Sequence, residues 1–279
     1  MIAILATAVL IWIAIDSFGS KKIRQTIINA TTKNFQQCLE EENHESLLHQ
    51  IQGLSTPLRN YLERSQALAA LPLQTTRLKF KGVSKRQDRK RWIPIEAKLF
   101  LTGLPLTLAY YEDRTLGLFV SGKRVQLLQK DHVTAQYKVG SLFQVSDQPQ
   151  GEAFVEVLVQ VLGHLPWHAD LLLLPNWLWD EANEKQVKGT FYWGNQEIEL
   201  NYQFDKDGHI KSFLTRIPNQ ETLQSAVIEI EYHYFDYKEL DGYHAPSHYQ
   251  VLRSAGKKPG TIAKFDITEV VQNSPFAWW

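Results

Sequence analysis

The sequence predicts an α+β protein that is mainly antiparallel β, in which a large curved sheet or open half-barrel wraps a buried helix. An N-terminal membrane helix and a helical lead-in come first. Apolar residues recur at three- and four-residue intervals before residue 72 and at two-residue intervals after it. Successive strand segments lie too close in sequence for parallel crossovers, which need about a dozen residues or more. Residues 151–163 are apolar around most of a helical circumference, as expected of a helix buried against a sheet.

Composition and charge narrow the possible partners. Of the 279 residues, 44% are hydrophobic and 22% are charged, which provides enough apolar area for a globular core. Thirty basic residues balance thirty acidic ones, so no overall field attracts nucleic acid, and no nucleic-acid partner is expected. Cys38 is the single cysteine, which excludes an internal disulfide and a metal site built from several thiolates. The sequence predicts no cofactor and no metal.

Residues 1–18 are predicted to be a single-pass transmembrane anchor in contact with membrane lipid. Residues 2–15 are apolar except for one threonine, although the run falls a little short of the ~20 residues that cross a bilayer. Lys21, Lys22 and Arg24 follow it, and the positive-inside rule then favours a soluble domain on the cytoplasmic side, with a periplasmic or extracellular location left open. A cleaved signal peptide is the alternative, but its basic residues would normally precede the apolar run.

Residues 19–70 are predicted to form a helical lead-in. Ser55, Thr56 and Pro57 place a hydroxyl cap before a proline in the first helical turn, which starts a short helix expected to end near Ala70. Pro72 lies at the boundary with the antiparallel β domain, residues 71–279.

About ten strands are predicted in the β domain, the number expected of a large curved sheet. Turns are expected at Asp113-Arg114, Gly122-Lys123, Gly194-Asn195 and Asp207-Gly208, the last because Asp-Gly supplies the positive φ angles of a tight hairpin. The strand candidates are 77–81, 93–101, 106–111, 116–121, 123–129, 191–193, 197–204, a strand from Ile210, 227–234, 249–252 and 262–270.

Several segments occur in a recognisable order: Thr56–Leu62, Arg91–Ala97, Gly151–Trp167, Phe204–Arg216, Asp241–Pro246 and Phe265–Glu269. In this order, over residues 54–270, they resemble a bacterial family of unknown function whose members are N-terminally anchored. That family resembles in shape the LolA-like periplasmic lipoprotein carriers, in which a curved antiparallel sheet wraps helices around an apolar cavity for lipid chains. The resemblance therefore implies such a cavity here. His164 stands where family members tend to carry an acidic residue, which puts any chemistry by that acid in doubt.

Aromatic residues are the candidate ligand-binding groups, because such rings can line an apolar cavity. The alternative is that they form core and cross-strand pairs, which is the commoner fate of strand aromatics. The favoured function is noncatalytic binding of a lipid or another hydrophobic molecule. The predicted ligand-binding residues are Trp92, Trp167, Trp177, Trp179, Tyr192 and Trp193, and a second aromatic group follows at Tyr232, Tyr234, Phe235 and Tyr237.

Paired histidines support an alternative, a metal-assisted hydrolase using His164, His168 and Asp170. His164 and His168 are four residues apart, as are His244 and His248, and such imidazoles can share zinc on a continuous helix. A proline lies within each pair, which argues against a continuous helix. Gly-x-Ser-x-Gly and glycine-rich phosphate motifs are absent. A structural role in a membrane assembly is a third possibility, and the oligomeric state and ligand identity are left open.

The segment 81–91 carries six basic residues between two predicted strands. It is either a solvated loop or a surface that rests on anionic lipid headgroups.

Overall fold

One antiparallel sheet of thirteen strands makes up most of the described part of the chain. The computed structural model describes residues 14, 16–29, 31–32, 44–71, 73, 75–87, 89–103, 105–117, 120–129, 132–139, 141, 143–147, 150–218, 227–255 and 259–274. The strands are β1 (Thr76–Ser84), β2 (Ile93–Thr102), β3 (Thr107–Thr115), β4 (Ser121–Gln129), β5 (His132–Val139), β6 (Phe143–Asp147), β7 (Trp177–Asn183), β8 (Gln186–Trp193), β9 (Gln196–Phe204), β10 (Ile210–Pro218), β11 (Val227–Leu240), β12 (Tyr243–Ala255) and β13 (Gly260–Gln272).

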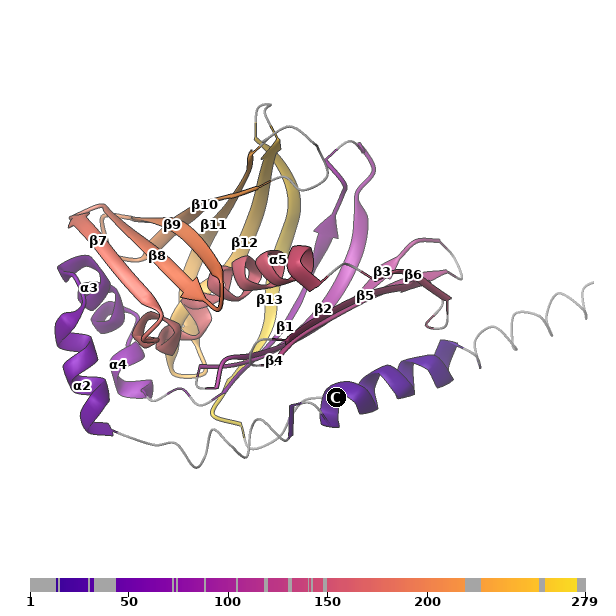
Figure 1. Cartoon of the computed structure of the whole chain (residues 1–279), viewed down its shortest axis with the longest axis horizontal. Coiled ribbons are helices and arrows are strands. Elements are labelled where there is room, and N and C mark those ends of the chain that lie inside the picture. The colour runs from indigo at the N-terminus through magenta and orange to yellow at the C-terminus, as the bar shows by residue number, and fades with distance from the viewer. Residues whose placement is uncertain are drawn as a thin grey trace, which may run out of the picture.

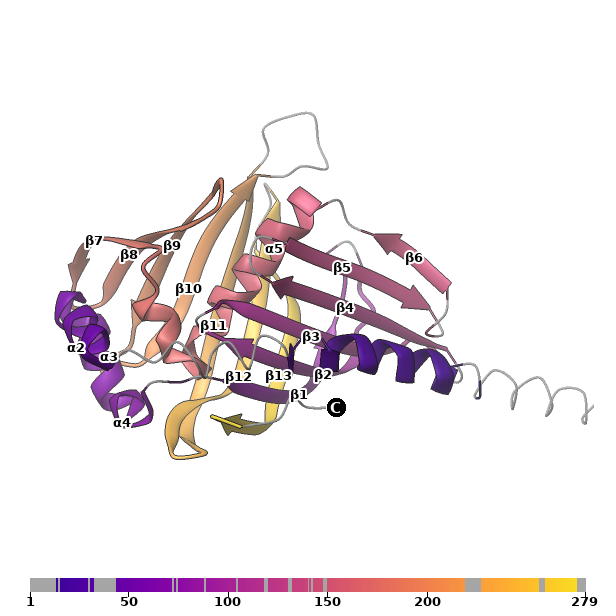
Figure 2. The same ribbon diagram turned by 60° about the horizontal axis from the view of Figure 1, so that its bottom comes forward.

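The sheet consists of two runs of hairpins that meet in its middle. The strand order is β6-β5-β4-β3-β2-β1-β13-β12-β11-β10-β9-β8-β7, so the chain starts at the centre, moves to one edge, crosses over, and returns from the other edge. β1 pairs antiparallel with both β2 and β13, which joins the two runs. Figures 1 and 2 show the sheet curving around one helix. The predicted fold, mainly antiparallel β in a large curved open sheet, is confirmed.

That helix is α5 (Gln150–Gly163), which makes the crossover between β6 and β7. It lies on the concave side of the sheet, as Figure 1 shows, and the side chains of Val157, Leu158, Val161 and Leu162 are fully buried. Two short 3₁₀ turns follow, η1 (Leu165–Trp167) and η2 (Ala169–Leu173). The buried helix predicted over residues 151–163 is thus confirmed in type and position.

Along the chain, three helices lie between the helix described below and the sheet: α2 (His44–Gly53), α3 (Thr56–Arg64) and α4 (Ala67–Ala70). α3 contacts β7 and β8, α2 contacts η2, and α4 contacts β12. α3 begins at the predicted Thr56-Pro57, with proline in its first turn. Ser55 occupies the N-cap position, but its hydroxyl makes no capping hydrogen bond within the described residues. Tyr61 and Leu62 of α3 are fully buried and join the main core.

A further helix, residues 16–29, lies on the outer, convex side of the sheet (Figure 2). Ile23 and Ile27 pack against Phe100, Ala109 and Val125 of β2, β3 and β4, forming a second, small hydrophobic core. This helix is therefore docked on the sheet through an apolar stripe at four-residue spacing.

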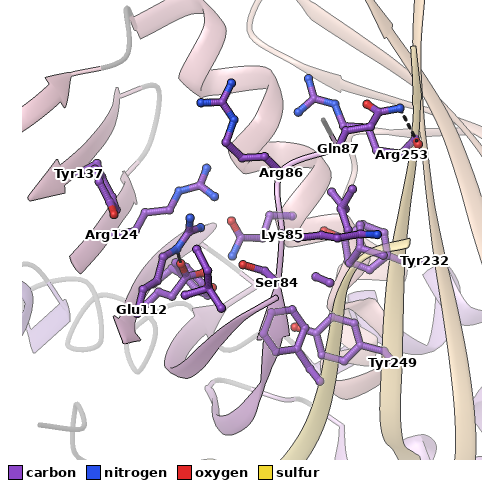
Figure 3. A pocket seen from close by; sticks show the side chains of 18 of the residues that line it. Ser84, Lys85, Arg86, Gln87, Glu112, Arg124, Tyr137, Tyr232, Tyr249 and Arg253 are labelled. Atoms are coloured by element: carbon purple, nitrogen blue, oxygen red, sulfur yellow. Dashed lines mark hydrogen bonds and ion pairs between the residues drawn. The ribbon is translucent and has the colours of Figure 1, made fainter. Parts of the chain in front are cut away.

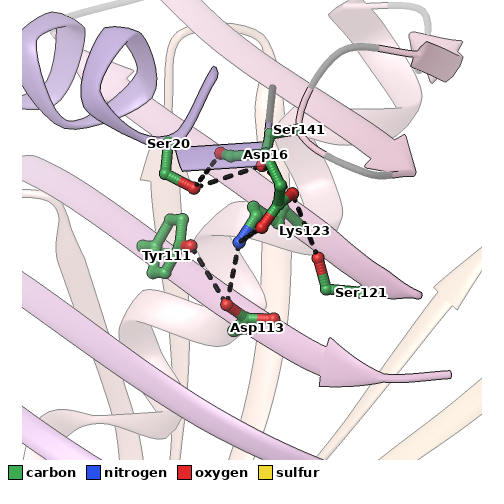
Figure 4. Close-up of polar contacts among 7 residues, drawn as sticks. All are labelled: Asp16, Ser20, Tyr111, Asp113, Ser121, Lys123 and Ser141. Carbon is green, nitrogen blue, oxygen red and sulfur yellow. Dashed lines mark hydrogen bonds and ion pairs between the residues drawn. The ribbon is translucent and has the colours of Figure 1, made fainter. Parts of the chain in front are cut away.

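Polar contacts hold the same helix at its start, as Figure 4 shows. Asp16 accepts a hydrogen bond from Ser141 at 2.6 Å and lies 3.6 Å from the buried ammonium of Lys123. Lys123 also pairs with Asp113 of β3 at 2.9 Å. A buried ammonium between two carboxylates is paired on both sides, which offsets the cost of its desolvation.

No helix within the described ranges is long and apolar enough to cross a membrane. The anchor predicted at residues 1–18 falls mostly on residues 1–13 and 15, which lie outside the described residues. Its membrane contact and the side of the membrane stay predictions.

Two predicted turns are wrong, because both Asp113-Arg114 and Gly122-Lys123 lie inside strands. β3 and β4 pair with Glu112 opposite Arg124 and Asp113 opposite Lys123, so opposite charges face each other across the hairpin. The predicted strand at 116–121 lies instead between β3 and β4, and only its last residue begins β4. β5, β6 and β7 were not predicted.

Candidate functional site

A cavity of about 950 Å³ lies on the concave side of the sheet. Its walls come from β1 to β5 of the first run, from β11 to β13 of the second run, and from the last turns of α5. It therefore spans the line along which the two halves of the sheet meet. The side chains of Arg86 and Gln87, after β1, are exposed at its rim.

Aromatic rings on adjacent strands form one wall. Tyr249 of β12 stands directly opposite Phe265 of β13, and their ring centroids are 5.0 Å apart. Tyr232 of β11 continues the row, nearly parallel to Tyr249 at 6.1 Å, and Tyr110 of β3 faces the cavity from the other half of the sheet. Burial raises the pKa of all three tyrosines, so their hydroxyls stay protonated at neutral pH. The row of rings lines the cavity together with aliphatic neighbours such as Val251 and Ile262.

A buried carboxylate lies in the wall contributed by β3. Glu112 is 3% exposed, accepts a hydrogen bond from the Tyr110 hydroxyl at 2.5 Å, and pairs with the guanidinium of Arg114. The three residues alternate along the strand, so all three side chains face the same side of the sheet. Both carboxylate oxygens of Glu112 are therefore occupied by groups of its own strand.

The remaining charged groups in the described part of the lining are basic. Arg124 of β4 reaches Glu156 of α5 at 3.4 Å, while Lys85 and Arg253 approach from the opposite side (Figure 3). The Lys85 ammonium lies 4.7 Å from the centre of the Trp92 ring, a cation–π distance.

His164 lines the cavity just after the end of α5. Its Nδ1 lies 2.6 Å from the carbonyl oxygen of Gln160, and because a carbonyl only accepts, Nδ1 carries the proton. Burial lowers the pKa of His164 to about 4, so the ring is neutral at pH 7. Nε2 is then an acceptor, and it has no partner among the described residues.

Residues 46–265 match the model of a family of unknown function, DUF6544. The chain belongs to DUF6544. The family of unknown function expected from the sequence is thereby confirmed. No curated protein matches this DUF6544 protein.

Solved structures similar to this DUF6544 protein share little sequence with it. A domain assigned to outer-membrane lipoprotein sorting, from Vibrio parahaemolyticus, is 8% identical, with 78% of this chain and 94% of that chain covered and a TM-score of 0.42. A LolA superfamily protein from Nitrosomonas europaea is 9% identical, with 79% and 95% covered and a TM-score of 0.37. The lipoprotein LppX from Mycobacterium tuberculosis is 10% identical, with 83% and 95% covered and a TM-score of 0.24. The first two of these neighbours are named for lipoprotein sorting and for the LolA superfamily, the likeness expected from the sequence.

The predicted ligand-binding residues of the DUF6544 protein lie elsewhere than in the cavity lining. Trp167 is fully buried in the core, where its indole N–H donates to the carbonyl oxygen of Pro246 at 2.9 Å. Trp177 and Trp179 stack on each other at 4.2 Å on β7, the edge strand. Trp167 is thus a core residue, and Trp177 forms a cross-strand pair with Phe191 of β8, at 4.9 Å between ring centroids.

The other three predicted residues are also outside the lining. Trp193 stacks with Phe191 at 6.1 Å on β8, Tyr192 is 42% exposed, and Trp92 lies beneath Lys85 and Lys264. A ligand-binding role for all six stays a prediction. Of the second aromatic group, Tyr232 does line the cavity.

The histidine pairs contact protein groups. His168 Nδ1 is 2.7 Å from the Thr76 hydroxyl, and Asp170 accepts the backbone N–H of Leu73 at 2.8 Å. The 3₁₀ turn η1 separates His164 from His168, so the two rings do not share a helix face, as the intervening proline predicted.

The second pair is likewise divided. His244 contacts His209 at 3.2 Å, whereas His248 lies 3.2 Å from each of Asp236 and Asp266. Across the described part of the chain, no three His, Cys, Asp or Glu side chains are grouped to hold a metal ion.

Proposed function

We propose that this DUF6544 protein binds a lipid or another hydrophobic molecule, without catalysis, in the cavity between α5 and the concave face of the sheet. The observation that carries the proposal is the size of the cavity together with its aromatic wall. About 950 Å³ is at the upper end of the range for small-molecule sites, roughly 300 to 1,000 Å³. Rings on adjacent strands and the aliphatic side chains beside them supply the apolar part of the lining.

The energetic reason is the removal of apolar surface from water. Each methylene group that a ligand buries contributes about 0.8 kcal/mol, so a chain of ten carbons offsets the entropy lost on association. The wall is already ordered by ring-to-ring packing, since Tyr232 stacks on Phe213 at 4.8 Å and on Tyr249. A preformed wall lowers the cost of ordering the site on binding.

The proposal is tested by filling the cavity. Tyr249 and Val251 of β12 line it, and Gln250 between them points to the opposite face of the sheet. We expect wild-type protein to bind N-phenyl-1-naphthylamine, an uncharged fluorescent probe, saturably. Val251→Trp should weaken this binding about tenfold or more, which corresponds to ~1.4 kcal/mol.

Gln250→Trp is the matched control, because it adds the same ring one residue away on the outer face. It should bind the probe like wild type, and circular dichroism of both variants should show the wild-type strand content. Equal probe binding by the two tryptophan variants, or none by wild type, would exclude the cavity as the binding site.

A further inference from the structure

We infer that the ligand carries an anionic group, a carboxylate or phosphate, at one end of its apolar body, and that Lys85, Arg124 and Arg253 hold this group at the cavity mouth. The inference rests on the proposed function and names the chemical class of the ligand.

The charged side chains of the described lining are mostly basic. Among the described residues, five basic side chains line the cavity, against one acidic side chain, Glu112, in a chain whose total charge is zero. A concave site with low-dielectric walls concentrates such a field and attracts the opposite charge. The basic residues are Lys85, Arg86, Arg114, Arg124 and Arg253.

One of these five cations is already neutralised by a carboxylate. Arg114 is paired with the buried Glu112. Arg124 has one contact with Glu156 at 3.4 Å, longer than the roughly 2.7 to 2.9 Å of a good charge-assisted hydrogen bond, and a guanidinium has five N–H donors. Most of the donors of Arg124 therefore stay available to a ligand.

Lys85 and Arg253 complete the mouth from the other half of the sheet. Neither side chain has an acidic partner within the described ranges of the chain. The Trp92 ring positions the Lys85 ammonium without neutralising it. Figure 3 shows Arg124 on one side of the hollow and Lys85 and Arg253 on the other, so an anion between them would contact both halves.

The residues of β12 that face the cavity change in character along the strand. Tyr249, Val251 and Arg253 alternate with outward-facing residues, so their side chains lie in a row on the cavity side. Tyr249 is 3% exposed and Val251 is 8% exposed, and the partly exposed Arg253 ends the row. The cavity wall thus changes from aromatic and buried to cationic and solvated, which matches a molecule with an apolar body and an anionic end.

β3 runs in the same direction, with Tyr110, Glu112 and Arg114 on the cavity side. Tyr110 and Glu112 are buried, and Arg114 is the most exposed of the three. Two strands from different halves of the sheet therefore both change from buried to more exposed side chains toward the rim.

The test compares ligands of equal chain length by titration calorimetry: dodecyl phosphate, 1-dodecanol and inorganic phosphate. We expect dodecyl phosphate to bind at least about tenfold more tightly than dodecanol, with a difference that shrinks as salt is raised from 50 to ~500 mM. Inorganic phosphate should bind more weakly than dodecyl phosphate, because it lacks the apolar body. Tighter binding of inorganic phosphate than of dodecyl phosphate would indicate a site for a free anion and overturn the inference.

The variant is the double substitution Lys85→Gln and Arg253→Gln, which leaves no carboxylate unpaired. It should lose about tenfold in affinity for dodecyl phosphate and keep wild-type affinity for dodecanol. Lys188→Gln, an exposed lysine on β8 outside the cavity, is the control and should change neither. Retained preference for the phosphate in the double variant, or equal affinities in wild type, would refute the anionic end. Binding of the uncharged probe would in that case still support the proposed function.

Discussion

Glu112 and Arg114 are charged residues placed inside a strand whose side chains face a cavity. The pair neutralises itself, and the Tyr110 hydroxyl satisfies the second carboxylate oxygen. A buried carboxylate with such partners is stable where an isolated one would not be. Glu112 also reduces the positive field that the other lining residues create, so its charge opposes the binding of an anion.

Glu112→Gln should therefore change stability and affinity in opposite directions. Removing the carboxylate leaves Arg114 without its partner and should lower the free energy of unfolding by about 2 kcal/mol, less than for a fully buried pair because Arg114 is partly exposed. Affinity for dodecyl phosphate should rise several-fold. Urea denaturation and calorimetry measure the two effects, and a loss of affinity would contradict the assigned role of this charge.

Stability should also depend on pH through three residues near α5. Burial lowers the pKa of His164 to about 4 and of His168 to about 3, so between pH 6.5 and 4 the unfolded chain takes up protons that the folded chain does not. Each histidine then lowers the free energy of unfolding by about 1.4 kcal/mol for each unit that the pH falls. Burial raises the pKa of Asp170 to about 7. Between about pH 4 and 7 the folded chain keeps this proton while the unfolded chain loses it, so the free energy of unfolding falls as pH rises over that range. This effect opposes that of one histidine.

Two histidines lower the free energy of unfolding as pH falls, and Asp170 cancels one of them. We therefore expect the free energy of unfolding to fall by about 1.4 kcal/mol per pH unit between pH 6.5 and 4. Asp170→Asn removes the opposing contribution, so the acid-side slope should become roughly twice as steep and the variant should gain stability at pH 7.5. Urea denaturation at several pH values measures both slopes. Equal slopes in wild type and variant would show that Asp170 titrates in the ordinary range.

At the scale of elements, the end of α5 is fitted against β11. A Cβ atom added to Gly163 would lie 2.7 Å from the Tyr232 ring, and the Tyr234 hydroxyl donates to the Gly163 carbonyl oxygen at 2.8 Å. Glycine thus allows the helix to approach the strand that carries part of the cavity wall.

Gly163→Ala should displace the Tyr232 ring from its stacking on Tyr249. We expect a loss of about 2 kcal/mol in the free energy of unfolding, typical of overpacking, and weaker binding of the uncharged probe. Gly53→Ala is the control, because a Cβ there meets no atom within 4 Å. A Gly163→Ala protein with wild-type stability and probe affinity would show that the contact does not position the wall.

The pattern of elements could be predicted from the sequence where local signals agree with the fold. The Asp205–Gly208 turn holds, with Gly208 at a φ of 80°, because Asp-Gly dictates that geometry locally. The β3–β4 hairpin was misplaced because its charged residues resemble a turn until their partners across the pair are known. Lys123 and Asp113 pair with each other across that hairpin at 2.9 Å.

The cavity could not be predicted residue by residue, for the same reason. Tyr110 joins Tyr232, Tyr249 and Phe265 only because β1 pairs with β13, a contact between distant parts of the chain. Periodicity predicts that such residues face one side of a strand, but not which strands become neighbours. The clustered tryptophans that attracted the sequence prediction are near one another in sequence, and those on β7 and β8 pack among themselves at one edge.

At the scale of the whole molecule, the cavity lies where the two runs of hairpins join. Residues from both halves form its walls, and α5, the segment that connects the halves, closes one side. A bound amphiphile would contact both halves at once, so it should stabilise the folded protein in proportion to its concentration relative to its Kd. The strands that join the two halves of the sheet thus also form the proposed binding site.

Native mass spectrometry of protein purified without detergent tests the existence of this ligand most directly. Wild-type protein and Gln250→Trp should carry an additional noncovalent mass that organic extraction releases as an amphiphile, and Val251→Trp should lack it. Spectra in which wild-type protein shows only the mass of the chain, even after incubation with a lipid extract, would contradict a binding cavity on the concave face of the sheet.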